Sequence, residues 1–270
     1  MENVTGMTKT KKTHRPLSWQ RVLPWVIPVL IILAWQAAVS AGWLNSNLLP
    51  SPLAVLQDGV KLAASGELMK NVSISLFRAL TGFAIGGSIG FILGMANGLS
   101  KVSRALFDST IQMLRNIPHL SLIPLVIILL GIGEGAKISL VAVGVMFPVY
   151  INTYHGITRV DPELIEMGKA YGLSKRQLLA KVIFPGALPT ILVGIRYALG
   201  VMWTTLIVAE TISSSSGIGY MATNAQEFMN MDTVLLCILM YALLGKASDL
   251  IAKALEDICL GWQQTGRSEG

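Results

Sequence analysis

Several polar and ionisable side chains interrupt apolar runs of this sequence, and they are the residues that could act on a ligand. Charged groups are costly inside a membrane, so they usually face a water-filled path, a bound ion or a partner charge. Hydroxyl and amide groups in the same runs could bind a ligand by donating hydrogen bonds. We therefore expect a possible path across the membrane to be lined by some of these residues: Arg115, Asn116, His119, Arg196, Thr204 and Thr205.

Structural roles stay open for several of these side chains. Arg115 is seven residues from Asp108, so the two could pair along one helix face. Arg196 could extend its charged end to the membrane surface while its stem stays in the apolar region. Lys246 and Asp249, at positions i and i+3, are expected to form an ion pair at the membrane interface.

Patterns that would indicate catalysis or a nucleotide site are missing from the sequence. The best match to a phosphate-binding loop, residues 131–137, has Ala136 at its second glycine position and is followed by Ile138. The three histidines are dispersed, so no metal site is expected. No basic patch carries interleaved aromatic residues, so nucleic acid is not an expected partner. We expect a protein that is not an enzyme and holds no cofactor of its own.

The composition indicates an all-α integral membrane protein. Of the 270 residues, 53% are hydrophobic and 13% are charged, whereas soluble domains contain about 25% charged residues. The first apolar run is longer than the roughly 7–15 residues of a signal peptide, so we expect it to be a retained span.

Apolar segments of about 20 residues predict six membrane-spanning helices. A basic tail, 1–21, precedes the first span, and a connector, 42–78, separates it from a core domain, 79–255. A second tail, 256–270, follows. The expected spans are 22–41, 79–99, 106–130, 136–155, 188–209 and 233–252. Prolines interrupt 106–130, which could be one kinked helix or a helix with a re-entrant piece.

Glycine recurs at every fourth position of the second expected span. Small residues at this spacing let two membrane helices approach closely. We expect a helix-packing surface formed by Gly82, Gly86, Gly90, Gly94 and Gly98.

Basic residues are concentrated on one side of the expected topology. The loops on the side of both termini hold most of the lysines and arginines, and such loops face the cytoplasm. An amphipathic stretch, 161–189, lies on this side. Asp161 and Pro162 fit the start of one helix, Gly172 its end, and Ser174 the capped start of a second, so a helix pair is expected at 161–185, ended by Pro185.

This helix pair resembles a motif of the permeases of ATP-binding-cassette (ABC) importers. Glu166, Gly172 and the run 182–185 match the pattern E-A-A-x-x-x-G followed by I-x-L-P. The chain departs from it at Met167 and Gly168 in the first part and at Val182 and Phe184 in the second, all small or apolar replacements. Further segments, including 49–52, 111–119 and 208–220, look like the sulfonate, taurine and nitrate branch, above all the aliphatic sulfonate permeases. The resemblance covers nearly all of the chain after residue 20.

The resemblance implies a type I importer permease in the bacterial inner membrane. Two copies would form the path, two cytoplasmic ATPase subunits carrying ATP and Mg²⁺ would dock on the helix pair, and a periplasmic binding protein would deliver the substrate. The residues implied in coupling are Asp161, Glu166, Gly168, Gly172, Ser174, Val182 and Pro185.

The substrate is expected to be a small organic anion, with an aliphatic sulfonate first and taurine or nitrate as alternatives. Positive or hydrogen-bond-donating path residues suit such an anion. Glu210, at the end of the fifth span, would repel it, so a structural or gating role is expected there. A gradient-driven secondary carrier is a competing function, but it would predict inverted repeats, and the two halves show no obvious repeat.

Overall fold

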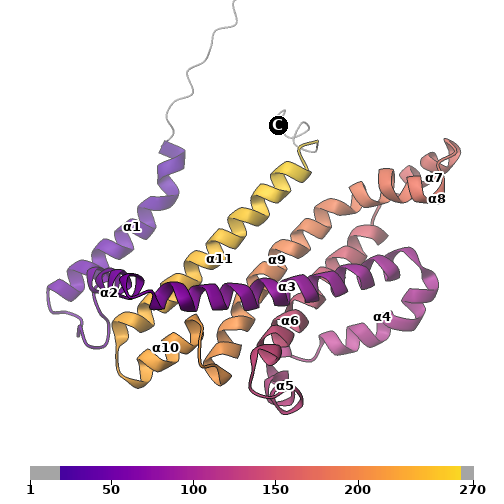
Figure 1. The fold of residues 1–270 in the computed structure, drawn as a ribbon. Coiled ribbons are helices and arrows are strands. Elements are labelled where there is room, and N and C mark those ends of the chain that lie inside the picture. Colours follow the sequence, from indigo (N-terminus) through magenta and orange to yellow (C-terminus); the bar gives the residue numbers. More distant parts are fainter. Residues whose placement is uncertain (1–18, 263–270) are drawn as a thin grey trace, which may run out of the picture. The chain divides into compact units, whose positions relative to one another are not determined.

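The computed structural model describes residues 19–262, which form an all-helical fold, as expected (Figure 1). The chain divides into two units, residues 1–54 and 55–270. The first unit contains α1 (Trp19–Ser40) and the start of α2 (Pro52–Ala64), where the Leu53 backbone N–H donates to Oε1 of Gln36 at 3.2 Å. The expected tails, 1–21 and 256–270, lie partly outside the described residues.

Within the described residues, four helical stretches are long and apolar enough to cross a membrane. They are α3 (Glu67–Leu99), α6 (Glu134–Thr158), the stretch Lys175–Ile212 and α11 (Met231–Cys259). A bent helix pair adds a fifth if it counts as one span, and the apolar part of α1, Val26–Ser40, is shorter. These helices extend beyond most of the expected spans; α3, for example, begins at Glu67, directly after Gly66 with φ +80°.

Helices α3 and α6 pack closely because α3 presents glycine along the contact. A Cβ atom on Gly86 or Gly90 would overlap backbone carbonyl groups of α6. One on Gly98 would lie only 2.8 Å from Cβ of Ile157. The positions that face α6 in this way are Gly82, Gly86, Gly90, Gly94 and Gly98. Side chains at these positions would push the two helices apart.

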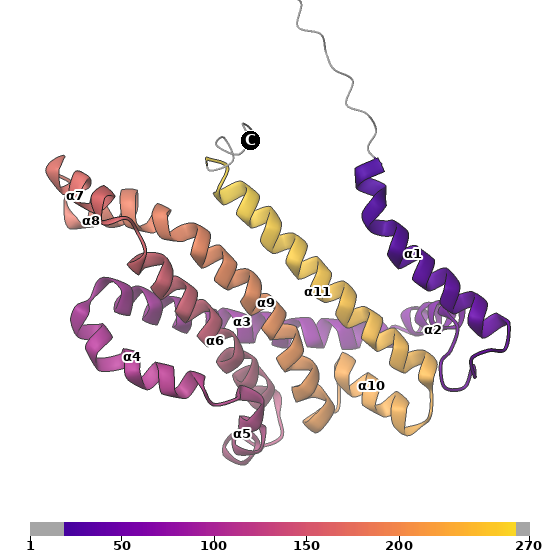
Figure 2. The ribbon, with the colours of Figure 1, turned by 180° about the vertical axis from the view of Figure 1, so that it is seen from behind.

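Helix α9 (Phe184–Ser213) packs between α6 and α11 (Figure 2). Its buried residues Met202 and Leu206 join Val145 of α6 in the main apolar core. The indole Nε1 of Trp203 donates to Oγ of Ser248 on α11 at 2.8 Å. Core packing and this polar contact therefore fix α9 against both neighbours.

The expected span 106–130 is two helical pieces bent by 85°. Helix α4 (Lys101–Arg115) ends before Pro118, and a 3₁₀ turn, η1 (His119–Leu122), leads into α5 (Ile123–Leu130). Proline disfavours the helical conformation of the residue before it, which explains the position of the break.

Pro185 does not end the helix that precedes it, contrary to the expectation from the sequence. Helix α8 (Lys175–Leu178) continues through a π-helical turn, η2 (Leu179–Ile183), into α9. Proline cannot donate a backbone hydrogen bond and crowds the carbonyl of residue i−4. The wider π turn ends at Ile183, two residues before Pro185, and the chain stays helical to the end of α9.

Candidate functional site

Helices α7 (Pro162–Ala170) and α8 form a short pair between α6 and α9, called the α7–α8 pair below. Asp161 caps α7, its Oδ1 accepting from the Glu163 backbone N–H at 2.9 Å. Gly172 has φ +74°, the left-handed conformation that suits glycine at a helix end. Ser174 and Gln177 form a reciprocal capping box at the start of α8. Local residue chemistry therefore sets both helix starts and the turn.

Close contact between α7 and α8 depends on Gly168. It is the buried residue of α7, and a Cβ atom there would lie 2.7 Å from Cδ1 of Leu178. Ile165 and Val182 pack against an apolar cluster that contains Ile157 of α6 and residues of α9. The inner face of the pair is thus attached to the ends of two long helices.

The outer face of the α7–α8 pair is apolar and exposed. Leu164, Met167 and Tyr171 are 45%, 52% and 80% exposed. Gly168 is buried, whereas these three side chains are exposed. Glu166 is also exposed, and exposed cations surround the face: Lys169, Lys175, Arg176 and Lys181.

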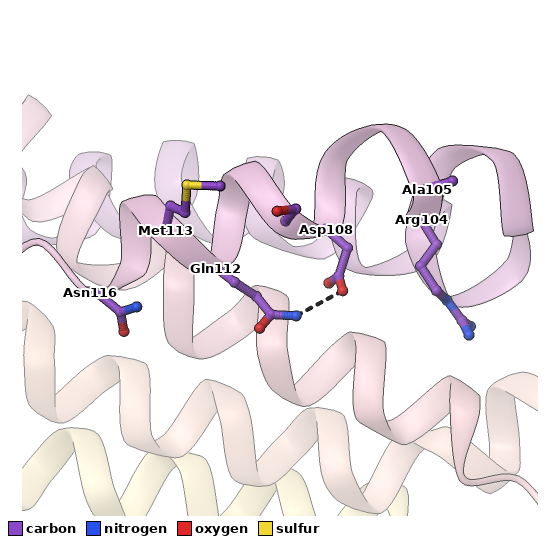
Figure 3. Close-up of a pocket in the computed structure, with 7 residues that line it drawn as sticks. Arg104, Ala105, Asp108, Gln112, Met113 and Asn116 are labelled. Atoms are coloured by element: carbon purple, nitrogen blue, oxygen red, sulfur yellow. Dashed lines mark hydrogen bonds between the residues drawn. The ribbon is translucent and has the colours of Figure 1, made fainter.

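A polar hollow of about 590 Å³ lies along α4 (Figure 3). Asp108, Gln112 and Asn116 follow one another at intervals of four residues, so they share one helical face. The hollow is lined by Arg104, Ala105, Asp108, Ser109, Gln112, Met113 and Asn116. Only Asn116 was among the expected path residues, although this four-residue polar spacing is visible in the sequence.

The other expected path residues occupy separate places. His119 Nε2 and Thr205 Oγ1 share a hydrogen bond of 2.9 Å, which joins the break after α4 to α9. Thr205 is buried, whereas Thr204 is exposed and donates to the Val201 carbonyl of its own helix. Arg115, at the end of α4, is exposed.

Arg196 is joined to α11 instead of being free to contact a ligand. Its guanidinium lies 2.6 Å from Asp249 Oδ1 and 3.9 Å from Glu256. The expected pair of Lys246 and Asp249 is confirmed at 3.3 Å. Asp108 accepts from the hydroxyl of Tyr150 and the amide of Gln112, so its contacts are not the expected one with Arg115.

A buried charged cluster lies near the opposite end of α9 and was not expected as a unit. We call it the Arg78 cluster: Asn71, Ser75, Arg78, Glu134, Glu210, Ser216 and Tyr241. Arg78 is fully buried and donates to Glu134 at 2.5 and 2.6 Å and to Glu210 at 2.8 Å. It also donates to the backbone carbonyl and the hydroxyl of Ser216.

Glu210 has a full set of hydrogen-bond donors in this cluster. Besides Arg78, it accepts from Ser75, Tyr241 and the backbone N–H of Gly219. Together with the pair of Arg78 and Glu134, these contacts join α3, α6, α9, α10 (Ile218–Glu227) and α11. The sequence positions of Arg78 and Glu210 are far apart, so no local pattern could have paired them.

The described residues contain no group of three or more His, Cys, Asp or Glu side chains placed to hold a metal ion. The polar side chains described above either hydrogen-bond to one another, as in the Arg78 cluster, or are exposed on the surface, as on the α7–α8 pair. Exposed apolar side chains thus gather on the α7–α8 pair, and polar side chains line one face of α4.

Comparison with known proteins gives consistent results. The profile described as "Binding-protein-dependent transport system inner membrane component" matches residues 86–257. The chain is 57% identical over 242 residues to the "Putative aliphatic sulfonates transport permease protein SsuC" of Escherichia coli, covering 90% of this chain and 92% of that one. The protein of the same name from Bacillus subtilis is 38% identical, with 95% and 92% covered.

The solved structures support the fold. A structure described as an amino acid ABC transporter with histidines aligns with a TM-score of 0.61 at 17% identity. The alignment covers 73% of this chain and 96% of that one.

Proposed function

Because this chain belongs to the family of binding-protein-dependent transport system inner membrane components, we propose that it imports a small anion with energy from a separate ATPase. The exposed α7–α8 pair is the observation that carries this proposal. An apolar helix face that enters a groove on a partner is a common mode of docking. Leu164, Met167 and Tyr171 would enter the ATPase groove, and the surrounding cations would favour acidic residues at its rim.

The α7–α8 pair is packed on the ends of α6 and α9, so a displacement of the pair by the ATPase would also move these membrane-spanning helices. Ile165 and Val182 pack on the cluster that holds Ile157 and Ile191. Packed side chains transmit displacement because protein interiors are dense and have low compressibility. The conformation of the α7–α8 pair depends on five residues: Asp161, Gly168, Gly172, Ser174 and Pro185. Glu166 lies on its surface.

The charge distribution supports a cytoplasmic location for the α7–α8 pair and both termini. Exposed Lys169, Lys175 and Arg176 lie on the pair and exposed Lys181 in η2 beside it, and cytoplasmic loops of membrane proteins are enriched in such residues. The Arg78 cluster would then lie toward the periplasm, where a binding protein delivers the substrate. ATP and Mg²⁺ would bind on the two ATPase subunits.

The path is proposed to run along the polar hollow of α4, closed by a second copy of the chain. Arg104, Gln112 and Asn116 offer hydrogen-bond donors to an anion there. Arg115 is exposed at the end of the same helix, and His119 and Thr205 lie at the break that follows. An aliphatic sulfonate suits this mixture of donors and methyl-bearing side chains, and the names of the E. coli and B. subtilis relatives favour it.

Reconstitution tests this function directly. The permease, its ATPase and its binding protein would be placed in liposomes, and uptake of an alkanesulfonate measured with ATP or with a non-hydrolysable analogue. We expect uptake only with hydrolysable ATP, and competition by taurine or nitrate would reveal a different substrate preference. Uptake driven by an ion gradient without the ATPase would refute the proposal and favour a secondary carrier.

A further inference from the structure

Four side chains form a continuous hydrogen-bonded connection between α3, α4 and α6, called the Tyr150 latch below. Ser103 Oγ donates to Asn97 Oδ1 at 2.5 Å, and Asn97 Nδ2 donates to the Tyr150 hydroxyl at 2.8 Å. Tyr150 donates in turn to Asp108 Oδ1 at 3.0 Å. The connection thus leaves α4, crosses α3 and α6, and returns to α4.

The middle of the Tyr150 latch is buried, and its end is not. Asn97 is fully buried and Tyr150 is 2% exposed, so neither can exchange its partners for water. Asp108, in contrast, lies in the polar hollow of α4, where Gln112 occupies its second oxygen at 2.7 Å. Both oxygens of this acid therefore accept hydrogen bonds.

Helix α4 has little apolar anchorage of its own. Ile111 is its single buried residue, while Leu106, Phe107 and Met113 are about half or more exposed. Because so few of its side chains are buried, α4 needs other contacts to fix its rotation about the helix axis. The two latch contacts, at Ser103 and Asp108, lie near its start and middle and supply that restraint.

The other end of the connection leads to the α7–α8 pair. Tyr150 belongs to α6, which runs on to Thr158 and is followed at Asp161 by the cap of α7. One turn beyond Tyr150, the ring of Tyr154 stacks on it at 6.1 Å and lies under the Arg104 guanidinium of α4 at 5.1 Å. The end of α6 thus contacts α4 on one side and continues into the α7–α8 pair on the other.

We propose that Tyr150 is a positioning residue that transmits movement of the α7–α8 pair to α4, the helix that lines the polar hollow. The proposal rests on the function proposed above, in which the ATPase acts on that pair. The hydroxyl makes this connection because it accepts from Asn97 and donates to Asp108 at once. Loss of the hydroxyl leaves the buried Asn97 amide without that partner and removes the contact that holds the middle of α4 at Asp108.

The test compares Y150F with Y154F in liposomes that contain the complete transporter. The two changes remove one hydroxyl each, from adjacent turns of α6. Of these two hydroxyls, that of Tyr150 has partners among the described hydrogen bonds. Sulfonate uptake and ATP hydrolysis would be measured on the same samples. We expect Y150F to keep ATP hydrolysis and lower uptake per ATP by about tenfold, the effect of one or two hydrogen bonds of about 1 kcal/mol each. Y154F should match the wild type.

A second variant keeps the test valid if Y150F does not fold. D108A removes the other end of the contact from the open hollow, and it should lower uptake per ATP in the same direction. The double variant should have no lower uptake per ATP than the poorer single variant, since both changes break the same contact between Tyr150 and Asp108. Equal uptake per ATP in Y150F and the wild type, or an equal fall in Y154F, would overturn the role of Tyr150. Absence of ATP-dependent uptake by the wild type would instead refute the proposed function itself.

Discussion

The polar groups near the two ends of α9 differ in burial: they are buried and paired at one end and exposed at the other. At one end, the Arg78 cluster is buried, and Arg78 and Glu210 have partners for nearly every donor and acceptor. At the other end, the α7–α8 pair holds its cations and its largest apolar side chains on the surface. The two regions lie well apart along the helix (Figure 1).

The difference shows that one helix can connect a rigid, buried polar cluster with an exposed surface that is free to bind a partner. A charged group without water is stable only with complete pairing, so the Arg78 cluster tolerates little rearrangement. A docking surface must leave side chains unpaired until its partner arrives. We therefore expect changes at the Arg78 cluster to affect stability, and changes at the α7–α8 pair to affect partner binding and transport.

The largest effect is expected from Arg78→Met. It leaves the buried Glu210 carboxylate and the partly buried Glu134 carboxylate without their main partner, which costs about 3–5 kcal/mol when one member of a buried pair is removed. Chemical unfolding of the purified permease in detergent would measure the loss. Arg176→Met is the control at the other end, with an expected change below about 0.5 kcal/mol because Arg176 is exposed. Similar losses in both variants would remove the contrast.

A large effect on binding, without an effect on stability, is expected from Tyr171→Ser. Exposed aromatic residues that fill a partner's pocket often contribute about 2 kcal/mol or more, so affinity for the ATPase should fall by about 30-fold. Binding of the purified ATPase to the permease in nanodiscs would measure it. Phe228→Ser is the matched control, since Phe228 is 77% exposed but lies beside α10. Equal affinities for the Tyr171 and Phe228 variants would contradict the proposed docking face.

A smaller effect is expected from Gly172→Val. Gly172 has φ +74°, and no atom lies within 4 Å of a Cβ placed there, so the cost is backbone strain of about 1–2 kcal/mol. The turn between α7 and α8 should shift, and uptake by cells with equal protein levels should fall several-fold. Gly172→Asn should lose less, because asparagine tolerates this conformation. The prediction fails if both variants transport equally.

The smallest effect is expected from Ser174→Ala. Loss of the capping hydroxyl costs about 1 kcal/mol and acts on the first turn of α8 alone. Hydrogen exchange of the Gln177 amide should become about fivefold faster, while the midpoint of global unfolding stays the same. A lowered unfolding midpoint would show that the α7–α8 pair is coupled to the core more strongly than the comparison implies.

Local features of the fold followed directly from the sequence. Asp161, Gly172 and the Ser174–Gln177 box act on their own or on residues two or three positions away, so the residue types alone determine where α7 and α8 begin and turn. The four-residue glycine repeat of α3 is equally local, since it places one smooth stripe on one helix. The low charge content likewise indicated a membrane protein without knowledge of any contact.

Only the tertiary structure decided which residues meet across helices. Nothing local pairs Arg78 with Glu210, Arg196 with Asp249 or Asp108 with Tyr150. Apolar periodicity also does not show that Leu164 and Met167 face outward while Ile165 packs inward. In a membrane protein lipid-facing and core-facing positions are both apolar, so hydrophobicity gives the helix but not its neighbour. The neighbours depend on shape, on where a glycine admits another backbone and on where a buried charge finds its partner.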